Sequence, residues 1–190
     1  MMSSRAEATK ARILEAAAAE FSAFGIAGAR VDRIANAAKA NKNLIYIYFE
    51  SKDRLFDAVF DAYVVRVIDV VPFTPEDLTG YVGKLFDFNV ANPDLLRLAT
   101  WHRLERGSDR TPAAVTESYR VKLDGLAEAQ AAEKVTTAFP PSILLALVLA
   151  IAGAWGAGSP VDVPARGTQD SDAQALRAAV VEGVRRMLSD

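Results

Sequence analysis

The chain has 190 residues, of which 51% are hydrophobic, so it can bury a substantial core and is not a disordered protein. It contains no cysteine and one histidine, which excludes disulfides and thiolate metal sites and leaves few ligands for a zinc centre. The formal net charge is −2, but residues 1–55 hold nine Lys or Arg against six Asp or Glu, so positive charge is concentrated in the amino-terminal part.

The first predicted element is a helix over residues 5–24 that ends at Gly25 and is followed by a turn over residues 25–29. The first 20 residues of the chain carry Arg5, Lys10, Arg12 and three Glu and lack the continuous apolar segment of a signal peptide, so we expect a cytoplasmic protein. The predicted apolar stripe of this helix consists of Ile13, Leu14, Ala17, Phe21 and Phe24.

Residues 31–49 then predict a short helix, a tight turn and a second short helix. Val31, Ile34, Ala35 and Ala38 share one face of the first helix, and the apolar period breaks at residues 39–41. Asn41 is expected to cap a second helix over Lys42 to Phe49 by accepting from the backbone N–H of Asn43 or Leu44. On that helix Ile45 and Phe49 share the packing face. This is the unit that presents a recognition helix to a major groove of DNA.

The segments ILEAAAAEFSAFG (13–25), VDRIANAA (31–38) and NKNLIYIYFESKDRL (41–55) resemble, in order and spacing, the amino-terminal domain of the tetracycline-repressor (TetR) family of bacterial transcriptional regulators. The resemblance implies an all-α fold of about nine helices, with a three-helix DNA-binding domain at residues 1–50 and an effector-binding and dimerisation domain at residues 51–190. The family usually has Thr or Ser at positions 29 and 30, Gly at Lys39, small residues at positions 43 and 44, and often His at Ile47.

Contacts to base edges specify a DNA sequence, and contacts to phosphates hold the recognition helix in register. The candidate residues therefore fall into base-contacting and phosphate-contacting groups. Lys42 and Asn43 are placed to reach base edges, and Leu44 and Ile47 to touch thymine methyl groups. By analogy with the family, Tyr46, Tyr48 and Lys52 contact phosphates, although Tyr48 is equally consistent with core packing. Three further basic residues could contact phosphates or could simply be solvated surface charges: Arg30, Arg33 and Lys39. The predicted DNA-binding set is Arg30, Asn41, Lys42, Asn43, Leu44, Tyr46, Ile47, Tyr48 and Lys52.

A fourth helix is predicted from the N-cap Ser51 to about Val70, and further helices near residues 75–91, 93–106, 112–136, 141–156 and 170–188. The apolar run over residues 143–157 has 15 residues, fewer than the roughly 20 that span a bilayer, so we interpret it as a buried helix that a second subunit covers. The two last helices then predict a four-helix interface in a homodimer. Its predicted residues are Leu144, Leu147, Val148, Ile151, Trp155, Leu176, Val180, Val184 and Met187.

The family resemblance further implies that the part of the chain after residue 74 holds a pocket for a small-molecule effector, which is largely apolar. Binding of the effector would change the distance of about 34 Å that two recognition helices need to dock on DNA together. No lining residue is specific, because helical aromatics more often pack in a core. The candidates are Tyr81, Phe86, Phe88, Asn89, Trp101, His102 and Tyr119.

We therefore predict a DNA-binding transcriptional regulator, a repressor released by its effector, that acts without a cofactor. An enzyme is disfavoured by the absence of cysteine, the single histidine and the lack of a glycine-rich phosphate loop. The alternative is a helical small-molecule-binding or protein-interaction protein with a degenerate DNA-binding head, which the unusual residues at positions 39, 43 and 44 leave open.

Overall fold

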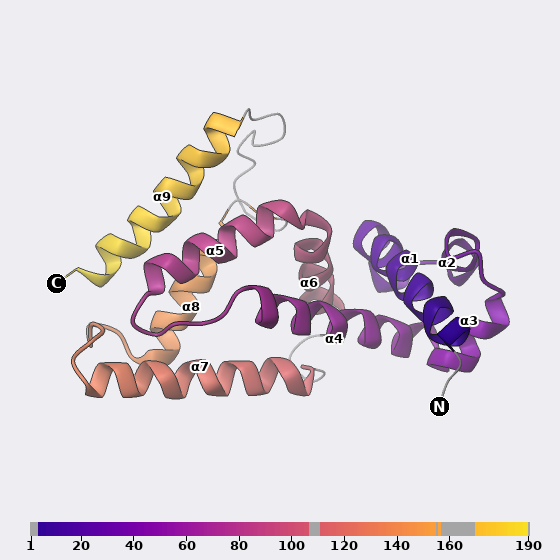
Figure 1. Cartoon of the computed structure of the whole chain (residues 1–190), viewed down its shortest axis with the longest axis horizontal. Helices are drawn as coiled ribbons and strands as arrows, with labels where there is room; N and C mark the ends of the chain where they lie inside the picture. Colours follow the sequence, from indigo (N-terminus) through magenta and orange to yellow (C-terminus); the bar gives the residue numbers. More distant parts are fainter. Residues whose placement is uncertain (1–3, 107–110, 155, 157–169, 190) are drawn as a thin grey trace. The chain divides into compact units, whose positions relative to one another are not determined.

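The fold is a series of helices, seen in a computed structural model that describes residues 4–106, 111–154, 156 and 170–189 (Figure 1). Within these ranges there are nine helices and no strand, which confirms the predicted all-α fold. The helices pack into two compact units, formed by residues 1–65 with 94–112 and by residues 66–93 with 113–190. These packing units do not test the functional boundary expected after residue 50, which stays a prediction.

The first unit consists of α1 (Ser4–Gly28), α2 (Val31–Ala37), α3 (Lys42–Phe49), the first part of α4 (Lys52–Val70) and nearly all of α6 (Pro93–Arg106). Its core is apolar and contains the predicted face of the short helix pair. Phe21 on α1 meets Phe56 on α4 edge to face, with 5.1 Å between ring centroids. The fully buried side chains of this unit include Ile13, Phe21, Ile34, Ile45, Leu55, Phe56 and Leu98.

The path of α1 changes at Gly25, whose backbone has φ +68° and ψ −176° inside the helix. Glycine adopts this conformation without the steric cost that a Cβ would add, which explains the predicted helix end there. Phe24, which we expected on the apolar stripe, is 50% exposed instead. The buried positions 13, 17 and 21 follow a spacing of four, so the next one is Gly25 and Phe24 lies to one side.

The second unit consists of the end of α4 with α5 (Leu78–Ala91), α7 (Ala113–Ala131), α8 (Pro141–Ala152) and α9 (Asp170–Leu188). Helix α5 packs against both α8 and α9, and α8 also packs against α7 and α9. Helix α7 ends before residue 136, the predicted limit, because the chain turns at Glu133 (φ +55°). In the described ranges, no helix has both the length and the apolar character needed to cross a membrane.

Candidate nucleic-acid interface

Helices α2 and α3 form the predicted helix-turn-helix, and backbone geometry makes the turn between them sharp. Ala38 ends α2 in a helical conformation, and Lys39 then adopts φ +50°. The N–H of Lys39 donates to the carbonyl of Asn36 at 3.1 Å and that of Ala40 to Ala35 at 3.0 Å. A positive φ favours glycine, so the geometry explains why the resemblance leads us to expect glycine where this chain has lysine.

The start of α3 is capped as predicted. The Asn41 side-chain oxygen accepts from the N–H of Asn43 at 2.8 Å, and the Asn41 carbonyl accepts from the N–H of Leu44 at 2.9 Å. The helix ends at Phe49, after which Glu50 adopts φ +66° and donates its N–H to the Tyr46 carbonyl at 2.8 Å. Both ends are therefore held by the chain itself, which keeps the eight-residue α3 helical without help from a ligand.

The two sides of α3 differ in exposure. Ile45 and Phe49 are buried, which confirms their packing role. On the other side Tyr46 is 43% exposed and Ile47 71% exposed, and Asn41, Lys42 and Asn43 are exposed as well. Leu44 and Tyr48 are half-buried, with the Tyr48 ring 6.4 Å from that of Phe49, edge to face. The helix thus packs through one face and leaves a mixed polar and apolar face open.

The exposed lysine of α3 has a partner on α2. Lys42 Nζ lies 2.8 Å from an Asp32 carboxylate oxygen. The hydrogen bond from Lys42 lowers the pKa of Asp32, and the same hydrogen bond raises the pKa of Lys42. Both side chains are exposed, so water screens the pair and a phosphate or base can compete for the ammonium.

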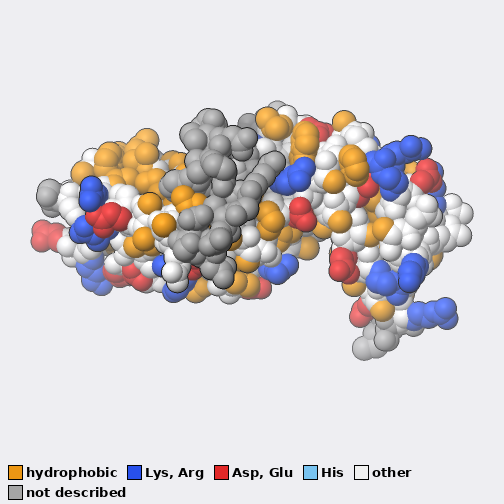
Figure 2. All heavy atoms as spheres, turned by 90° about the horizontal axis from the view of Figure 1, so that it is seen from above, with side chains coloured by type: hydrophobic (Ala, Val, Ile, Leu, Met, Phe, Trp, Pro, Cys, Tyr) orange, Lys and Arg blue, Asp and Glu red, His pale blue; other side chains and the backbone are white. Residues whose placement is uncertain are grey.

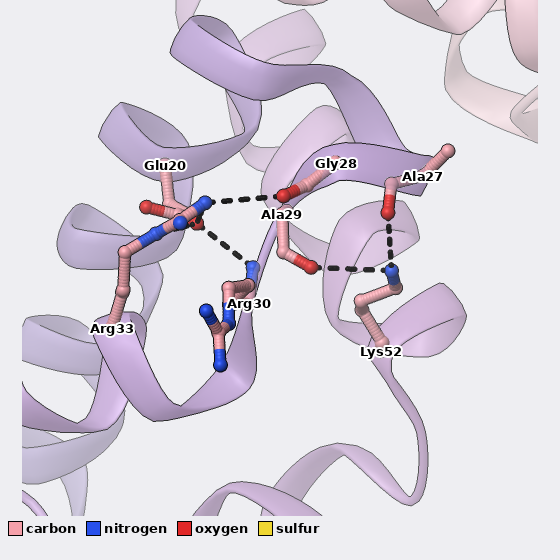
Figure 3. Close-up of polar contacts among 7 residues, drawn as sticks. All are labelled: Glu20, Ala27, Gly28, Ala29, Arg30, Arg33 and Lys52. Atoms are coloured by element: carbon pink, nitrogen blue, oxygen red, sulfur yellow. Dashed lines mark hydrogen bonds and ion pairs between the residues drawn. The ribbon is translucent and has the colours of Figure 1, made fainter.

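The junction of α1, α2 and α4 is held by side chains that bind backbone groups (Figure 3). Glu20 on α1 accepts from the N–H of Arg30 at 2.8 Å and from the Arg33 guanidinium, with 2.6 Å to its Nη2. Arg33 also donates to the carbonyl of Gly28 at 3.1 Å and lies 4.2 Å from the centre of the Phe24 ring. Arg33 therefore positions α2, whereas the Arg30 side chain is exposed at the start of that helix.

Burial acts to raise the pKa of Glu20, but the hydrogen bonds from Arg33 and from the Arg30 N–H outweigh it, and the net effect is a lowered pKa. The Glu20 carboxylate is therefore charged at neutral pH where it caps the start of α2.

Lys52, the predicted phosphate contact at the start of α4, reaches back to the turn after α1. Its Nζ donates to the carbonyls of Ala27 and Ala29, each at 3.2 Å (Figure 3). An ammonium has three N–H donors, so one remains for an anion. Figure 2 shows Lys and Arg side chains gathered over the α1 to α3 end of this unit, where they predominate over Asp and Glu.

Helix α6 contributes contacts to the first unit that no local sequence pattern indicates. The Glu105 carboxylate accepts from the N–H groups of Ile26 at 3.0 Å and Ala27 at 2.9 Å, just after the change of direction at Gly25. The Trp101 indole donates to the carbonyl of Ser22 at 3.1 Å. Trp101 was predicted to line an effector pocket, but here it attaches α6 to α1.

One cavity of about 710 Å³ lies within the first unit, between α4 and α6. Of the predicted effector residues, His102 alone is among the described lining residues; it is buried and stacks on Phe60 at 4.0 Å between centroids. Tyr81, Phe86 and Phe88 are buried in the second unit, Asn89 donates to the Ala152 carbonyl at 3.2 Å, and Tyr119 is exposed. The predicted pocket residues thus belong to two units. The cavity lining comprises Ser51, Asp53, Arg54, Asp57, Phe60, Asp61, His102 and Pro112.

The predicted dimer residues fall into two groups. Leu144, Val148, Val180 and Val184 are buried inside the second unit, so they form its core rather than a surface, and that part of the prediction is wrong. The reason is that α8 and α9 cover each other and α5 within one chain. Leu147, Ile151, Leu176 and Met187 are half-buried. Trp155 lies outside the described residues.

The comparisons with known proteins agree with this geometry. Residues 13–59 match the family model for bacterial regulatory proteins of the tetR family, and residues 77–186 match the tetracyclin repressor-like C-terminal domain. The chain belongs to the TetR family. It is therefore a DNA-binding transcriptional regulator, as the resemblance predicted.

Relatives extend over the whole chain. It is 40% identical over 189 residues to the HTH-type transcriptional repressor SCO4008 of Streptomyces coelicolor, with 96% of each protein covered. It is 31% identical over 112 residues to the HTH-type transcriptional repressor NicS of Pseudomonas putida, with 54% of this chain and 52% of NicS covered. Among solved structures, SCO4942 of Streptomyces coelicolor, a protein assigned to transcriptional regulation, aligns with a TM-score of 0.83 at 40% identity, covering 94% of this chain and 97% of that one.

Proposed function

We propose that this TetR-family regulator is a homodimeric repressor that binds duplex DNA through the open face of α3 and leaves it when a small molecule binds. The observation that carries the DNA part is the exposure of Lys42, Asn43, Tyr46 and Ile47 opposite the buried pair Ile45 and Phe49. The names of SCO4008 and NicS, both HTH-type transcriptional repressors, support repression.

Each residue on this face has a role that its chemistry suits. The Asn43 side chain can pair with the adenine edge and Lys42 can donate to guanine, once it leaves Asp32. Leu44 and Ile47 offer apolar contact to thymine methyl groups. Tyr46, Tyr48, Lys52 and Arg30 supply phosphate contacts around the reading helix. The start of α4 adds the favourable end of a helix dipole beside Lys52.

A dimer is supported by the exposed side of α9. Ala175, Ala179 and Gly183, four residues apart, are all exposed, and a Cβ added at Gly183 meets no atom within 4 Å. Small side chains allow a second helix to approach closely. Figure 2 shows hydrophobic side chains gathered where α9 lies in the second unit. In a twofold dimer each copy contributes one α3 helix, as helix-turn-helix proteins that read two half-sites require.

The DNA part is tested by salt-titrated binding to fragments around the protein's own gene, compared with random duplex of equal length. We expect sequence preference, a steep fall in affinity with salt, and loss of about 1 to 3 kcal/mol of discrimination in Asn43→Ala. Lys52→Ala should lower the salt slope by about one, because one phosphate contact is removed.

Lys134→Ala is the matched control, since Lys134 is an exposed lysine of the second unit that also pairs with a carboxylate, Glu76, at 3.3 Å. It should leave the slope unchanged. Equal affinity for all fragments would favour the alternative of a binding protein with a degenerate head.

The dimer is tested by sedimentation equilibrium of Gly183→Trp, which places a large ring on the exposed side of α9. We expect the variant to be monomeric, while Ala127→Trp at an exposed site on α7 stays dimeric. A wild-type monomer, or a Gly183→Trp dimer of unchanged affinity, would contradict the proposed interface.

A further inference from the structure

Helices α2 and α3 place a carboxylate and an ammonium group side by side on the exposed face. Asp32 lies in the first turn of α2 and Lys42 is the first residue of α3, and their charged atoms are 2.8 Å apart. The Asp32 side chain is 58% exposed and the Lys42 side chain 46% exposed. Together they form a hydrogen-bond donor and an acceptor at the start of the recognition helix.

The backbones that carry these two side chains are held in place. Ile34 is fully buried and anchors α2 in the core, and Glu20 accepts from the N–H of Arg30 at the start of that helix. Asn41 caps α3 through the N–H of Asn43. The freedom of the pair therefore lies in its side chains, each of which can turn toward a ligand.

The carboxylate stands on a surface that would approach negative phosphates. Asp32 is the only acidic residue in the sequence between Glu20 and Glu50, a stretch that holds four basic residues. The hydrogen bond from Lys42 lowers the pKa of Asp32, so the carboxylate is charged at neutral pH. When Lys42 turns to guanine, Asp32 is left unpaired beside the phosphates, which weakens binding. DNA that offers Asp32 a hydrogen-bond donor at this point avoids that loss.

One kind of base pair offers a partner to each side chain. In the major groove, G·C presents the acceptors N7 and O6 on guanine and the donor N4–H₂ on cytosine. O6 and N4 are hydrogen-bonded to each other and hence about 2.9 Å apart, close to the 2.8 Å between the Lys42 and Asp32 charged atoms. At the same two positions A·T presents the donor N6–H₂ and the acceptor O4. It would therefore meet the ammonium with a donor and the carboxylate with an acceptor.

We propose that Lys42 and Asp32 together read one G·C base pair in each half-site, with Lys42 donating to guanine and Asp32 accepting from the cytosine N4–H₂ group. Asp32 is then a specificity-determining residue on α2, outside the recognition helix. The proposal rests on the DNA-binding part of the proposed function, to which it adds a base pair and a second residue that reads it. Because α2 and α3 fix the order of acceptor and donor, G·C is also distinguished from C·G.

The first measurement is the base preference at every position of the site. Full-length protein selects from duplexes with a random core of about 20 base pairs, two helical turns, and the bound fragments are sequenced. We expect each half-site to contain a G·C pair whose preference disappears in Lys42→Met and weakens in Asp32→Ala. Glu76→Ala is the matched control, because Glu76 is the exposed carboxylate of another lysine pair, with Lys134. It should leave all preferences unchanged.

Modified bases in the selected duplex then locate the two contacts, with affinity measured by fluorescence anisotropy. Replacing the G·C pair by A·T should weaken wild-type binding by about tenfold and Asp32→Ala binding by about threefold. N4-methylcytosine replaces the cytosine N–H that faces the major groove, so it should weaken the wild type by about fivefold and Asp32→Ala by less than about twofold. Inosine in place of guanine keeps the same major-groove edge and should change affinity by less than about twofold.

The folding of the variants is checked by thermal melts, which should stay close to the wild type because both side chains are exposed. Asp32→Asn keeps the shape and an acceptor oxygen, so it should retain part of the G·C preference. This gives a second variant in which the role of Asp32 can be measured.

Three results would overturn the proposal. Asp32→Ala could bind all duplexes more tightly with unchanged base preferences, which would mean that Asp32 only repels phosphates. Lys42→Met and Asp32→Ala could lose preference at different base pairs, or N4-methylcytosine could weaken the wild type and Asp32→Ala equally. A wild type without any sequence preference would contradict the proposed function as well, whereas a preference that does not involve Asp32 would contradict this inference alone.

Discussion

The two packing units are held together in different ways. In the first unit, charged side chains bind backbone groups of neighbouring helices: Glu20 at the start of α2, Glu105 after Gly25, and Lys52 at the turn before α2. In the second unit, the α5, α8 and α9 helices meet through apolar side chains, and ion pairs such as Arg120 with Glu117 lie on the surface. Charged side chains that bind the backbone therefore position the DNA-binding helices, whereas apolar burial dominates in the other unit, where Asn89 also donates to the Ala152 carbonyl and Arg177 pairs with Asp87.

The lengths of the helices explain the contrast. Helices α2 and α3 have seven and eight residues, so each offers only two or three side chains to a core. Short helices are marginal on their own, and charge-assisted bonds to their ends add stability and fix their direction. The helices of the second unit have 12 to 19 residues and bury more apolar surface, so polar bonds between them, such as Arg177 with Asp87 at 2.9 Å, add to packing that is already extensive.

The largest expected effect comes from opening a cavity in the apolar unit. Leu144→Ala should lower the free energy of unfolding by about 3 kcal/mol, because the side chain is fully buried and the site cannot collapse completely. Urea titration followed by circular dichroism measures the change. Leu104→Ala, at an exposed leucine, should change stability by less than about 0.5 kcal/mol. Similar losses at both positions would contradict the assignment of Leu144 to the core of the second unit.

A substitution at Gly25 tests the backbone of the first unit. Gly25→Ala should cost about 2 kcal/mol, since alanine is strained at φ +68° and its Cβ would press on Glu105 and Trp101. Gly28→Ala is the control, because its nearest contact, Phe24 Cβ at 3.4 Å, leaves room. A neutral Gly25→Ala variant in thermal melts would contradict the strain argument.

A substitution at Glu20 tests the polar contacts of the first unit and should have a smaller effect on stability. Glu20→Gln should cost about 1 kcal/mol at pH 7, because it keeps the shape but loses the charge that binds Arg33. The lowered pKa of Glu20 means that its contribution is complete above the ordinary value of 4.5 and is lost as pH falls through the lowered value. The gap between wild type and variant in chemical denaturation should therefore shrink with acid. The exposed Glu15→Gln should show no such gap, and a gap that widens on acidification would refute the assignment.

The smallest effect is expected at the surface of the second unit. Arg120 makes ion pairs with Glu117 and Asp124 one turn away on either side, and all three side chains are exposed. Arg120→Gln should leave the melting temperature unchanged at 0.15 M salt, because water and ions screen such pairs. A clear loss that disappears in 1 M salt would show that surface ion pairs also stabilise this unit.

Most of the candidate DNA site could be predicted from the sequence, because its information is local. The bounds of α3, the cap at Asn41 and the packing of Ile45 and Phe49 all follow from residues within one short segment. The effector and dimer residues were harder, because an apolar helical residue looks the same whether it meets its own chain or a partner. Leu144 and Val148 are examples, since α5, α7 and α9 bury α8 within the subunit.

The order of helices, their caps and the family to which the chain belongs were set by residue type and spacing, since a helix is stabilised mainly by neighbours within a few positions. Only the tertiary structure brought the Glu105 carboxylate to the backbone N–H groups after Gly25 and the Trp101 indole to the carbonyl of Ser22. Both pairings join residues 79 positions apart, and no local periodicity encodes which distant polar groups will meet.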